Sequence, residues 1–221
     1  GDHTIVLGSG NDTYTSTTTS AGTSGVTATA GTNIITTGAG VDSITLGTGV
    51  DTVTAGDGID TITTLTANLV STDTINAGDG VDILAISDAS TVANGGVVDA
   101  DFTNITNLET INSGNNALTL TLGAASMAAG LITVTDGTGV TTLTVGAGHT
   151  SALAVNLSTG DDKIVGSASA AVLTVSADID SITGSDTITG GTGSDTLTIT
   201  LDASGDTALA AVDLALVTGF E

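Results

Sequence analysis

Residues 40–63, GVDSITLGTGVDTVTAGDGIDTIT, repeat one nine-residue pattern almost three times. Asp42, Asp51 and Asp60 stand nine residues apart, and each lies two positions after a glycine and two positions before an aliphatic residue. Apolar and polar residues alternate between the glycines, as they do in short β-strands rather than in helices. The stretch therefore predicts a chain of short strands separated by glycine-rich turns.

The composition favours a folded β-protein without an aromatic core. Of the 221 residues 39% are hydrophobic, but there is no Trp, one Tyr and two Phe. Short aliphatic runs such as LTLTL (118–122) are therefore expected to form a thin, layered core. Thirty-one glycines and no proline fit many sharp turns, and the absence of Cys rules out disulfides and thiolate metal sites.

The charge balance excludes several classes of partner. The chain carries 24 acidic residues against one basic residue, for a formal net charge of −23. Nucleic acid is a poor partner because its binding begins with Lys and Arg on phosphates, and an anionic membrane surface is equally poor. No run of about 18 apolar residues is present, so no membrane insertion is predicted. The chain begins and ends inside repeat motifs, and we expect it to be part of a longer protein.

The nine-residue frame can be written x-G-x-G-x-D-x-U-x, with U a large apolar residue. Six stretches fit it: 7–15, 37–45, 46–54, 55–63, 77–85 and 190–198. Weaker units lie nine residues before a strong one, and their Asp position holds Asn33, Asp73, Asp186 or, before Asp12, His3. Residues 157–165 keep Asp162 but lack the first glycine, whereas residues 136–144 have Thr141 in place of the Asp.

This nonapeptide is similar to the RTX (repeat-in-toxin) unit, G-G-x-G-x-D-x-U-x, with its first glycine usually replaced here by Thr, Leu or Ala. The resemblance implies an all-β fold, a parallel β-roll or β-helix solenoid with calcium-binding nonapeptide turns. In it, a six-residue turn binds Ca²⁺ and the other three residues form a strand. Two nonapeptides make one coil, so residues eighteen apart stack on the same edge.

Electrostatics gives an independent reason to expect calcium. Asp42 and Asp60, or Asn33 and Asp51, would stack one coil apart at about 4.8 Å. Two bare carboxylates that close repel by about 3 kcal/mol at an effective dielectric constant of about 20, and the chain has almost no basic residues to cancel this. Ca²⁺ takes about six to eight oxygen ligands from carboxylates and turn carbonyls. The predicted metal-binding residues are Asp12, Asn33, Asp42, Asp51, Asp60, Asp73, Asp82, Asp162, Asp186 and Asp195, with the turn glycines Gly38, Gly40, Gly47, Gly49, Gly56, Gly58, Gly78, Gly80, Gly191 and Gly193.

A longer repeat divides the chain. Residues 80–111 parallel residues 193–221, each passing from an RTX-like turn through an apolar strand to a U-x-x-U-E motif. We predict a calcium-binding β-roll over 1–85, a calcium-poor β-helix over 86–156, and a second RTX-type segment with the start of the next module over 157–221. Within the middle part, only 90–102 and 124–130 could carry a short helix or an excursion, and 111–157 is expected to be largely free of ions.

The NLETI (107–111) and GFE (219–221) motifs in a Thr-, Ala- and Gly-rich chain resemble RTX-type surface-layer (S-layer) proteins of Gram-negative bacteria such as Caulobacter. That resemblance implies a structural protein exported by type I secretion, folded by calcium outside the cell and self-assembled into a homo-oligomeric lattice on the cell surface. It also implies contact with cell-surface lipopolysaccharide through regions outside this segment. Turn carboxylates outside the predicted ligand set, Asp57 and Asp79, could bind bridging cations between chains.

Two other functions remain open, and catalysis is not expected. The chain could be the stalk of an RTX adhesin. It could also be an ice-binding solenoid if Ser43, Thr52 and Thr61 form a hydroxyl column, although the insertion after Thr63 is expected to break that register. His3 and His149 are far apart, and His149 lies in a degraded turn, so no catalytic or His-based metal site is predicted.

Overall fold

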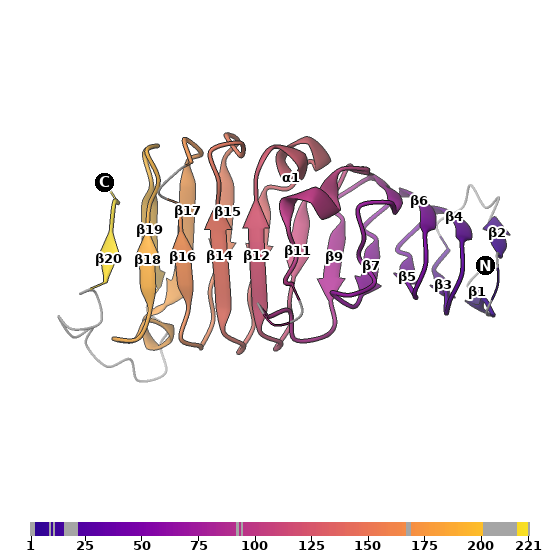
Figure 1. Ribbon diagram of the computed structural model, residues 1–221, viewed down its shortest axis with the longest axis horizontal. Coiled ribbons are helices and arrows are strands. Elements are labelled where there is room, and N and C mark those ends of the chain that lie inside the picture. Colours follow the sequence, from indigo (N-terminus) through magenta and orange to yellow (C-terminus); the bar gives the residue numbers. More distant parts are fainter. Residues whose placement is uncertain are drawn as a thin grey trace.

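The chain forms an elongated stack of coils in which parallel strands line two faces (Figure 1). This computed structural model describes residues 3–8, 10, 12–15, 22–91, 93, 95–166, 169–200 and 216–220. One face is a single ten-stranded sheet, here called the long sheet. Its strands, in spatial order, are β1 (His3–Val6), β3 (Ser24–Thr27), β5 (Ser43–Thr45), β7 (Thr61–Thr64), β9 (Ile83–Ile86), β11 (Thr110–Asn112), β13 (Thr133–Thr135), β15 (Leu153–Asn156), β17 (Leu173–Asp178) and β19 (Thr196–Thr200).

The opposite face is divided into two five-stranded sheets. The first short sheet contains β2 (Thr13–Thr15), β4 (Asn33–Ala39), β6 (Asp51–Asp57), β8 (Thr74–Asp79) and β10 (Ile105–Thr106). The second short sheet contains β12 (Leu118–Leu122), β14 (Thr141–Val145), β16 (Lys163–Val165), β18 (Thr187–Thr189) and β20 (Val217–Thr218). Successive strands along the chain alternate between the two faces, and neighbouring strands in each sheet pair in parallel, for example β5 with β7 and β4 with β6. The predicted all-β parallel solenoid is confirmed.

The core lies between the faces and is built from the aliphatic position of each repeat. Ile44, Val53 and Ile62 are at most 1% exposed, whereas Thr52 and Thr54 on either side of Val53 are exposed. This alternation follows from the two-residue period of a strand, which turns neighbouring side chains to opposite faces of the sheet. The predicted inward direction of the U position is therefore confirmed.

The division of the second face coincides with the longest coil. After β9 the chain pairs with the edge of β12 at two points, where Ser90 N–H donates to Ala117 O at 2.8 Å and Val97 N–H donates to Thr119 O at 2.9 Å. The 3₁₀ helix η2 (Asp99–Phe102) then leads into β10 of the first short sheet. A second short helix, α1 (Ala124–Ala129), follows β12, so both predicted excursions are confirmed. A further 3₁₀ turn, η3 (Ile179–Ser181), follows β17.

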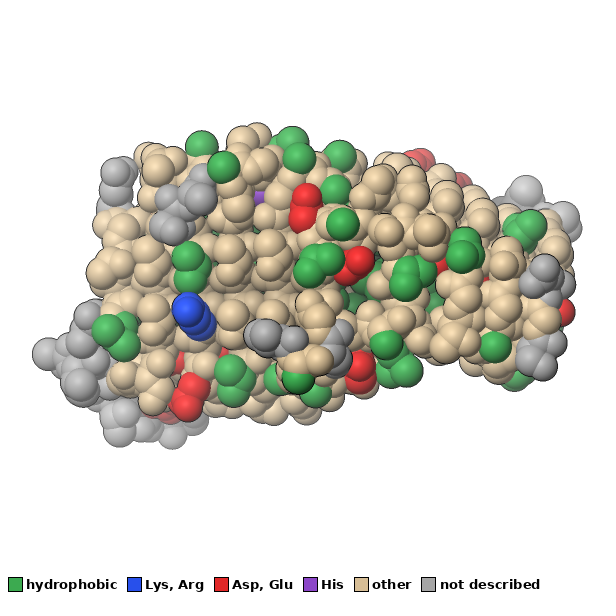
Figure 2. Space-filling view, viewed as in Figure 1, with side chains coloured by type: hydrophobic (Ala, Val, Ile, Leu, Met, Phe, Trp, Pro, Cys, Tyr) green, Lys and Arg blue, Asp and Glu red, His purple; other side chains and the backbone are tan. Residues whose placement is uncertain are grey.

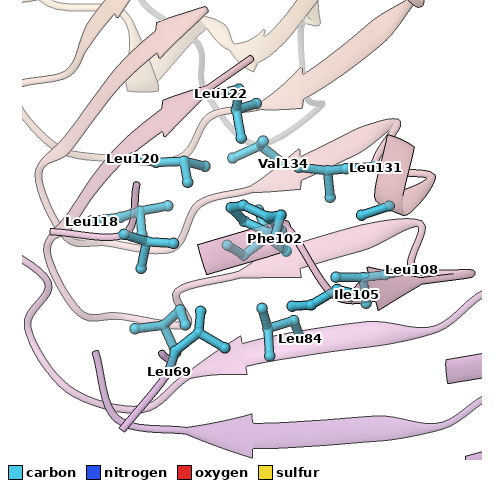
Figure 3. Close-up of a cluster of buried hydrophobic side chains, with 14 of the residues drawn as sticks. Leu69, Leu84, Phe102, Ile105, Leu108, Leu118, Leu120, Leu122, Leu131 and Val134 are labelled. Carbon is cyan, nitrogen blue, oxygen red and sulfur yellow. The ribbon is translucent and has the colours of Figure 1, made fainter. Parts of the chain in front are cut away.

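Phe102 fills the core at this junction. Its side chain is 1% exposed and lies among aliphatic side chains from the coils on either side, including Leu84, Ile105 and Leu120 (Figure 3). An aromatic ring buries a large apolar area and fills this part of the core. The core therefore continues through the break between the two short sheets.

Two expectations about register are wrong. Ser43 and Thr61 are neighbours in the long sheet, whereas Thr52 lies in the first short sheet on the other face. Nonapeptides alternate between faces, so residues nine apart cannot form one column. The insertion after Thr63 does not break the register, because β7 and β9 still pair from Thr61–Ile83 onward and the extra residues form turns between β7 and β8.

Candidate metal centre

A ladder of carboxylates lies at the start of the long-sheet strands. The Oδ1 atom of Asp60 accepts a hydrogen bond of 2.8 Å from the main-chain N–H of Asp42, one coil earlier. Asp82 Oδ1 accepts in the same way from Asp60 N–H at 2.8 Å, and Asp42 Oδ1 accepts from Ser24 N–H at 2.5 Å. Glu109 Oε2 continues the series by accepting from Asp82 N–H at 2.8 Å. These residues form the long-sheet ladder.

A second ladder lies at the start of the first short sheet. Asp51 Oδ1 accepts hydrogen bonds from the Asn33 side chain at 2.8 Å and from Asn33 N–H at 3.3 Å. Asp73 Oδ1 accepts from Asp51 N–H at 2.9 Å, while its Oδ2 accepts from Val70 N–H at 3.0 Å. The register of β2 with β4 places Asp12 one step before Asn33 in this column. Asn33 and Asp51, eighteen residues apart, therefore stack on one edge as predicted, whereas Asp51 and Asp73 stack at a separation of 22 residues.

The remaining predicted acidic residues lie in the second half of the solenoid. In the second short sheet, Asp162 Oδ1 accepts from Thr141 N–H at 2.8 Å and Asp186 Oδ1 accepts from Asp162 N–H at 2.6 Å. Asp195 belongs to the long sheet and accepts from Leu173 N–H at 2.8 Å. The structure thus arranges the predicted side chains in separate columns rather than in one site.

Several ladder carboxylates are satisfied by protein donors through one oxygen only, whereas both oxygens of Asp73, Asp186 and Asp195 accept main-chain hydrogen bonds. The predicted stack of bare carboxylates is corrected in this respect, because Oδ1 of Asp42, Asp51, Asp60, Asp73 and Asp82 accepts a main-chain hydrogen bond from the preceding coil. The second oxygen is often buried without a hydrogen-bond partner, which in the described part of the chain applies to Oδ2 of Asp12, Asp42, Asp60, Asp82 and Asp162. A buried, ionised oxygen without a donor is unfavourable. These atoms are therefore suited to binding a cation.

Main-chain carbonyls lie close to the same turns. Gly58 has φ +138°, and a Cβ at this position would lie 1.6 Å from the carbonyl oxygen of Gly40, one coil earlier. Only glycine permits both this backbone conformation and this approach. At eight other predicted glycines a Cβ would lie within 2.4 Å of a carbonyl oxygen of an adjacent coil: Gly40, Gly47, Gly49, Gly56, Gly78, Gly80, Gly191 and Gly193. Gly38 has φ +107° and is in register with Gly56.

Burial changes the acidity of several ladder carboxyls. It raises the pKa of Asp60 from 3.8 to about 6, against the lowering effect of the hydrogen bond from Asp42, and the charges of Asp42 and Asp82 raise it further. Burial likewise raises the pKa of Asp162 to about 7 and raises the pKa values of Asp73 and Asp82. Burial therefore disfavours the charged forms of these carboxyls, and positive charge beside them would offset this effect.

The donor set fits calcium. Ca²⁺ binds carboxylate and carbonyl oxygens in a tolerant geometry, and both kinds of oxygen meet at these turns. Among the described residues, no group of three or more Asp, Glu or His side chains gathers into one site. Bound calcium would supply positive charge beside the Oδ2 atoms that have no hydrogen-bond donor. The ladder Asp residues would contribute these oxygens, and the glycines would hold the carbonyls in place.

Three polar groups, Glu109, Asp136 and His149, were missed or misjudged from the sequence. Glu109 extends the long-sheet ladder, and only the recurring U-x-x-U-E motif pointed to it. Asp136 is 7% exposed, and its carboxylate accepts hydrogen bonds from Ser113 Oγ and Thr141 Oγ1.

His149 is fully buried, which lowers the pKa of its ring, and Nδ1 lies 3.4 Å from Ser126 Oγ.

Asp57 and Asp79 are exposed and in register on β6 and β8. His3 occupies the predicted ladder column through its pairing with Ser24.

Comparison with known proteins agrees with this geometry. The family model described as RTX calcium-binding nonapeptide repeat (4 copies) matches residues 27–62 and 180–198. Comparison with curated proteins and with solved structures found no match. The first matched segment contains Asp42, Asp51 and Asp60, and the second contains Asp186 and Asp195. These segments are RTX repeats, and the chain is a β-solenoid that carries calcium-binding nonapeptides of this family.

Proposed function

We propose that the chain is a structural calcium-binding segment of a secreted bacterial surface-layer protein that assembles into a lattice on the cell. The observation that carries the proposal is the long sheet, which runs from β1 to β19 with carboxylate ladders at its turns. The RTX solenoid is a structural fold, and proteins with such repeats are typically secreted. No helix in the described ranges is long and apolar enough to cross a membrane.

The surface supports weak, repeated contacts between copies. Figure 2 shows a face made mostly of uncharged polar side chains and backbone, with scattered hydrophobic side chains. Next to the long-sheet ladder, Val41, Ile59 and Val81 are 58%, 52% and 56% exposed. They recur once per coil because each precedes a ladder Asp, so they form a periodic apolar row. A lattice that depends on repetition would use small contacts of this kind.

Cations could bring such surfaces together. At a net charge of −23, copies of the chain repel one another. Asp57 and Asp79 are exposed neighbours on adjacent strands and lie outside the ladders. Calcium shared between these carboxylates and those of another copy would lower the repulsion. Export by type I secretion and attachment to lipopolysaccharide through other regions complete the proposed surface-layer role.

The lattice is tested by electron microscopy of the protein with and without millimolar calcium. We expect ordered sheets or filaments in calcium and their loss after chelation. The Asp57→Asn and Asp79→Asn double variant should fold with calcium but assemble poorly, whereas Asp161→Asn, which also removes an exposed charge, should assemble normally. A parent that stays monomeric at high concentration with calcium saturated would contradict the lattice.

The second candidate is the stalk of an RTX adhesin, favoured by the elongated form of the solenoid (Figure 1). A stalk needs length and stiffness but no lateral assembly, so a monomeric, calcium-rigidified parent would support it. The proposed three-part organisation, 1–85, 86–156 and 157–221, suits either role, because the junction around Phe102 lies in the middle part. The ice-binding alternative has lost its supporting hydroxyl column.

A further inference from the structure

The turn at 136–141 has the shape of an RTX turn although a threonine occupies its ladder position. A Cβ on Gly137 would lie 1.7 Å from the carbonyl oxygen of Gly114, and one on Gly139 would lie 2.2 Å from that of Asn116. These carbonyls of the preceding coil thus approach the glycines about as closely as in the matched repeats. The main-chain part of a metal site is present where the sequence pattern has lost its carboxylate.

Asp136 brings a carboxylate to this turn from a different position. It occupies the first position of the nonapeptide instead of the sixth, and its side chain is only 7% exposed. Its Oδ1 accepts hydrogen bonds from Thr141 Oγ1 at 2.8 Å and from Ser113 Oγ at 3.3 Å. Its Oδ2 is buried without a hydrogen-bond partner. The carboxylate therefore lies beside the residue whose own carboxylate is missing.

Asp162 provides a second carboxylate at the same place. Thr141 N–H donates to Asp162 Oδ1 at 2.8 Å, so Thr141 contacts the carboxylates of both Asp136 and Asp162. Asp162 is 1% exposed, and its Oδ2 is also buried without a partner. The only basic residue of the chain, Lys163, has an exposed side chain. Two neighbouring buried carboxylates thus each present one oxygen that no protein donor satisfies.

We propose that Asp136 replaces the missing ladder Asp and, together with Asp162 and carbonyl oxygens of the adjoining turns, binds a calcium ion. The proposal rests on the calcium chemistry of the proposed function and extends it to a coil outside both matched segments. Calcium fits because it accepts carboxylate and carbonyl oxygens together and tolerates irregular geometry. The region 111–157 was expected to be largely free of ions, and this site would make its ladder continuous with Asp162 and Asp186.

The test compares two variants of the full chain that remove one negative charge each. Asp136→Asn keeps the side-chain shape and can still accept from Thr141, whereas Asp161→Asn changes an exposed carboxylate next to Asp162. Calcium stoichiometry is measured by equilibrium dialysis at neutral pH, and hydrogen exchange is followed by mass spectrometry with and without calcium. Asp136→Asn should bind about one ion fewer and lose the calcium-induced protection of 136–145, and Asp161→Asn should behave as wild type.

A rescue variant separates loss of the ligand from damage to the turn. Adding Thr141→Asp to Asp136→Asn puts a carboxylate in the regular sixth position and should restore both the ion and the protection. Unchanged stoichiometry in Asp136→Asn, or failure of the double variant to regain the ion, would overturn the assignment.

Protection of 38–62 by calcium is an internal reference, because it reports only on the matched repeats. If calcium protects 38–62 but Asp136→Asn has no effect, only the site at Asp136 is contradicted. Its absence in the wild type would contradict calcium binding by the chain as a whole.

Discussion

Acid should partly substitute for calcium in this fold. Burial raises the pKa of Asp60 from 3.8 to about 6 and that of Asp162 from 3.8 to about 7. The folded chain therefore binds protons at Asp60 and Asp162 more tightly than the unfolded chain does. The resulting stabilisation is fully present below about pH 4 and is lost as the pH rises through about 6 for Asp60 and about 7 for Asp162. The calcium-free chain should thus become more stable as the pH falls from about 8 to about 4.

The size of the effect follows from the pKa values. One pKa unit corresponds to about 1.4 kcal/mol, so protonation should contribute about 3 kcal/mol through Asp60 and about 4 kcal/mol through Asp162 to the free energy of unfolding. Solvent screening is small because the two side chains are 0% and 1% exposed. A change of 1 kcal/mol shifts the Tm of a chain of this size by about 2–4 °C. Asp60 alone should therefore shift Tm by on the order of 10 °C.

Thermal unfolding followed by far-UV circular dichroism measures this shift. The protein is stripped of calcium and kept in metal-free buffer without chelator, because chelators lose calcium affinity in acid. Asp60→Asn should remove about 3 kcal/mol of the pH dependence, whereas the exposed Asp57→Asn should leave it unchanged. A Tm that stays constant or falls on acidification, or a wild-type slope in Asp60→Asn, would refute the reasoning. With calcium saturated, acid should instead lower stability, because protons then compete with the ion.

The other predictions concern calcium, turns and core. At neutral pH, millimolar chelator should abolish most β-structure and added calcium should restore it; an unchanged far-UV spectrum would count against a calcium-dependent fold. Asp51→Ala should weaken calcium binding in titration calorimetry more than Asp206→Ala, which lies in no nonapeptide, and equal losses would indicate mere charge screening. Gly58→Ala should cost about 3 kcal/mol or more in denaturant unfolding, whereas Gly8→Ala, with nothing within 4 Å of its Cβ, should cost less than about 1 kcal/mol. Phe102→Ala should cost about 3–5 kcal/mol through a cavity at the junction, and a loss below about 1 kcal/mol would mean that the core there collapses freely.

The repeat itself could be predicted from the sequence because its determinants are local. Glycine is needed where the backbone turns with positive φ, as at Gly58, and an aliphatic residue two positions after the Asp must face inward, as Ile62 does. Both requirements lie within nine residues, and they recur often enough to predict the parallel solenoid. The stacking of Asp42 on Asp60 followed from two nonapeptides per coil. The family model matches the tandem repeats that contain these residues.

Contacts across coils of unequal length could only come from the tertiary structure. The separation between hydrogen-bonded residues in the long-sheet ladder rises from 18 for Asp42 and Asp60 to 22 for Asp60 and Asp82, and to 27 for Asp82 and Glu109. Because these separations differ, a fixed repeat length cannot locate Glu109 or Asp136 in the sequence. Inserted residues form turns while the strands keep their register, because parallel hydrogen bonds and the inward side chains fix which residues meet. The sequence therefore determined the coil and its calcium chemistry, whereas the break between the two short sheets and the partners of Asp136 depended on how distant coils pack.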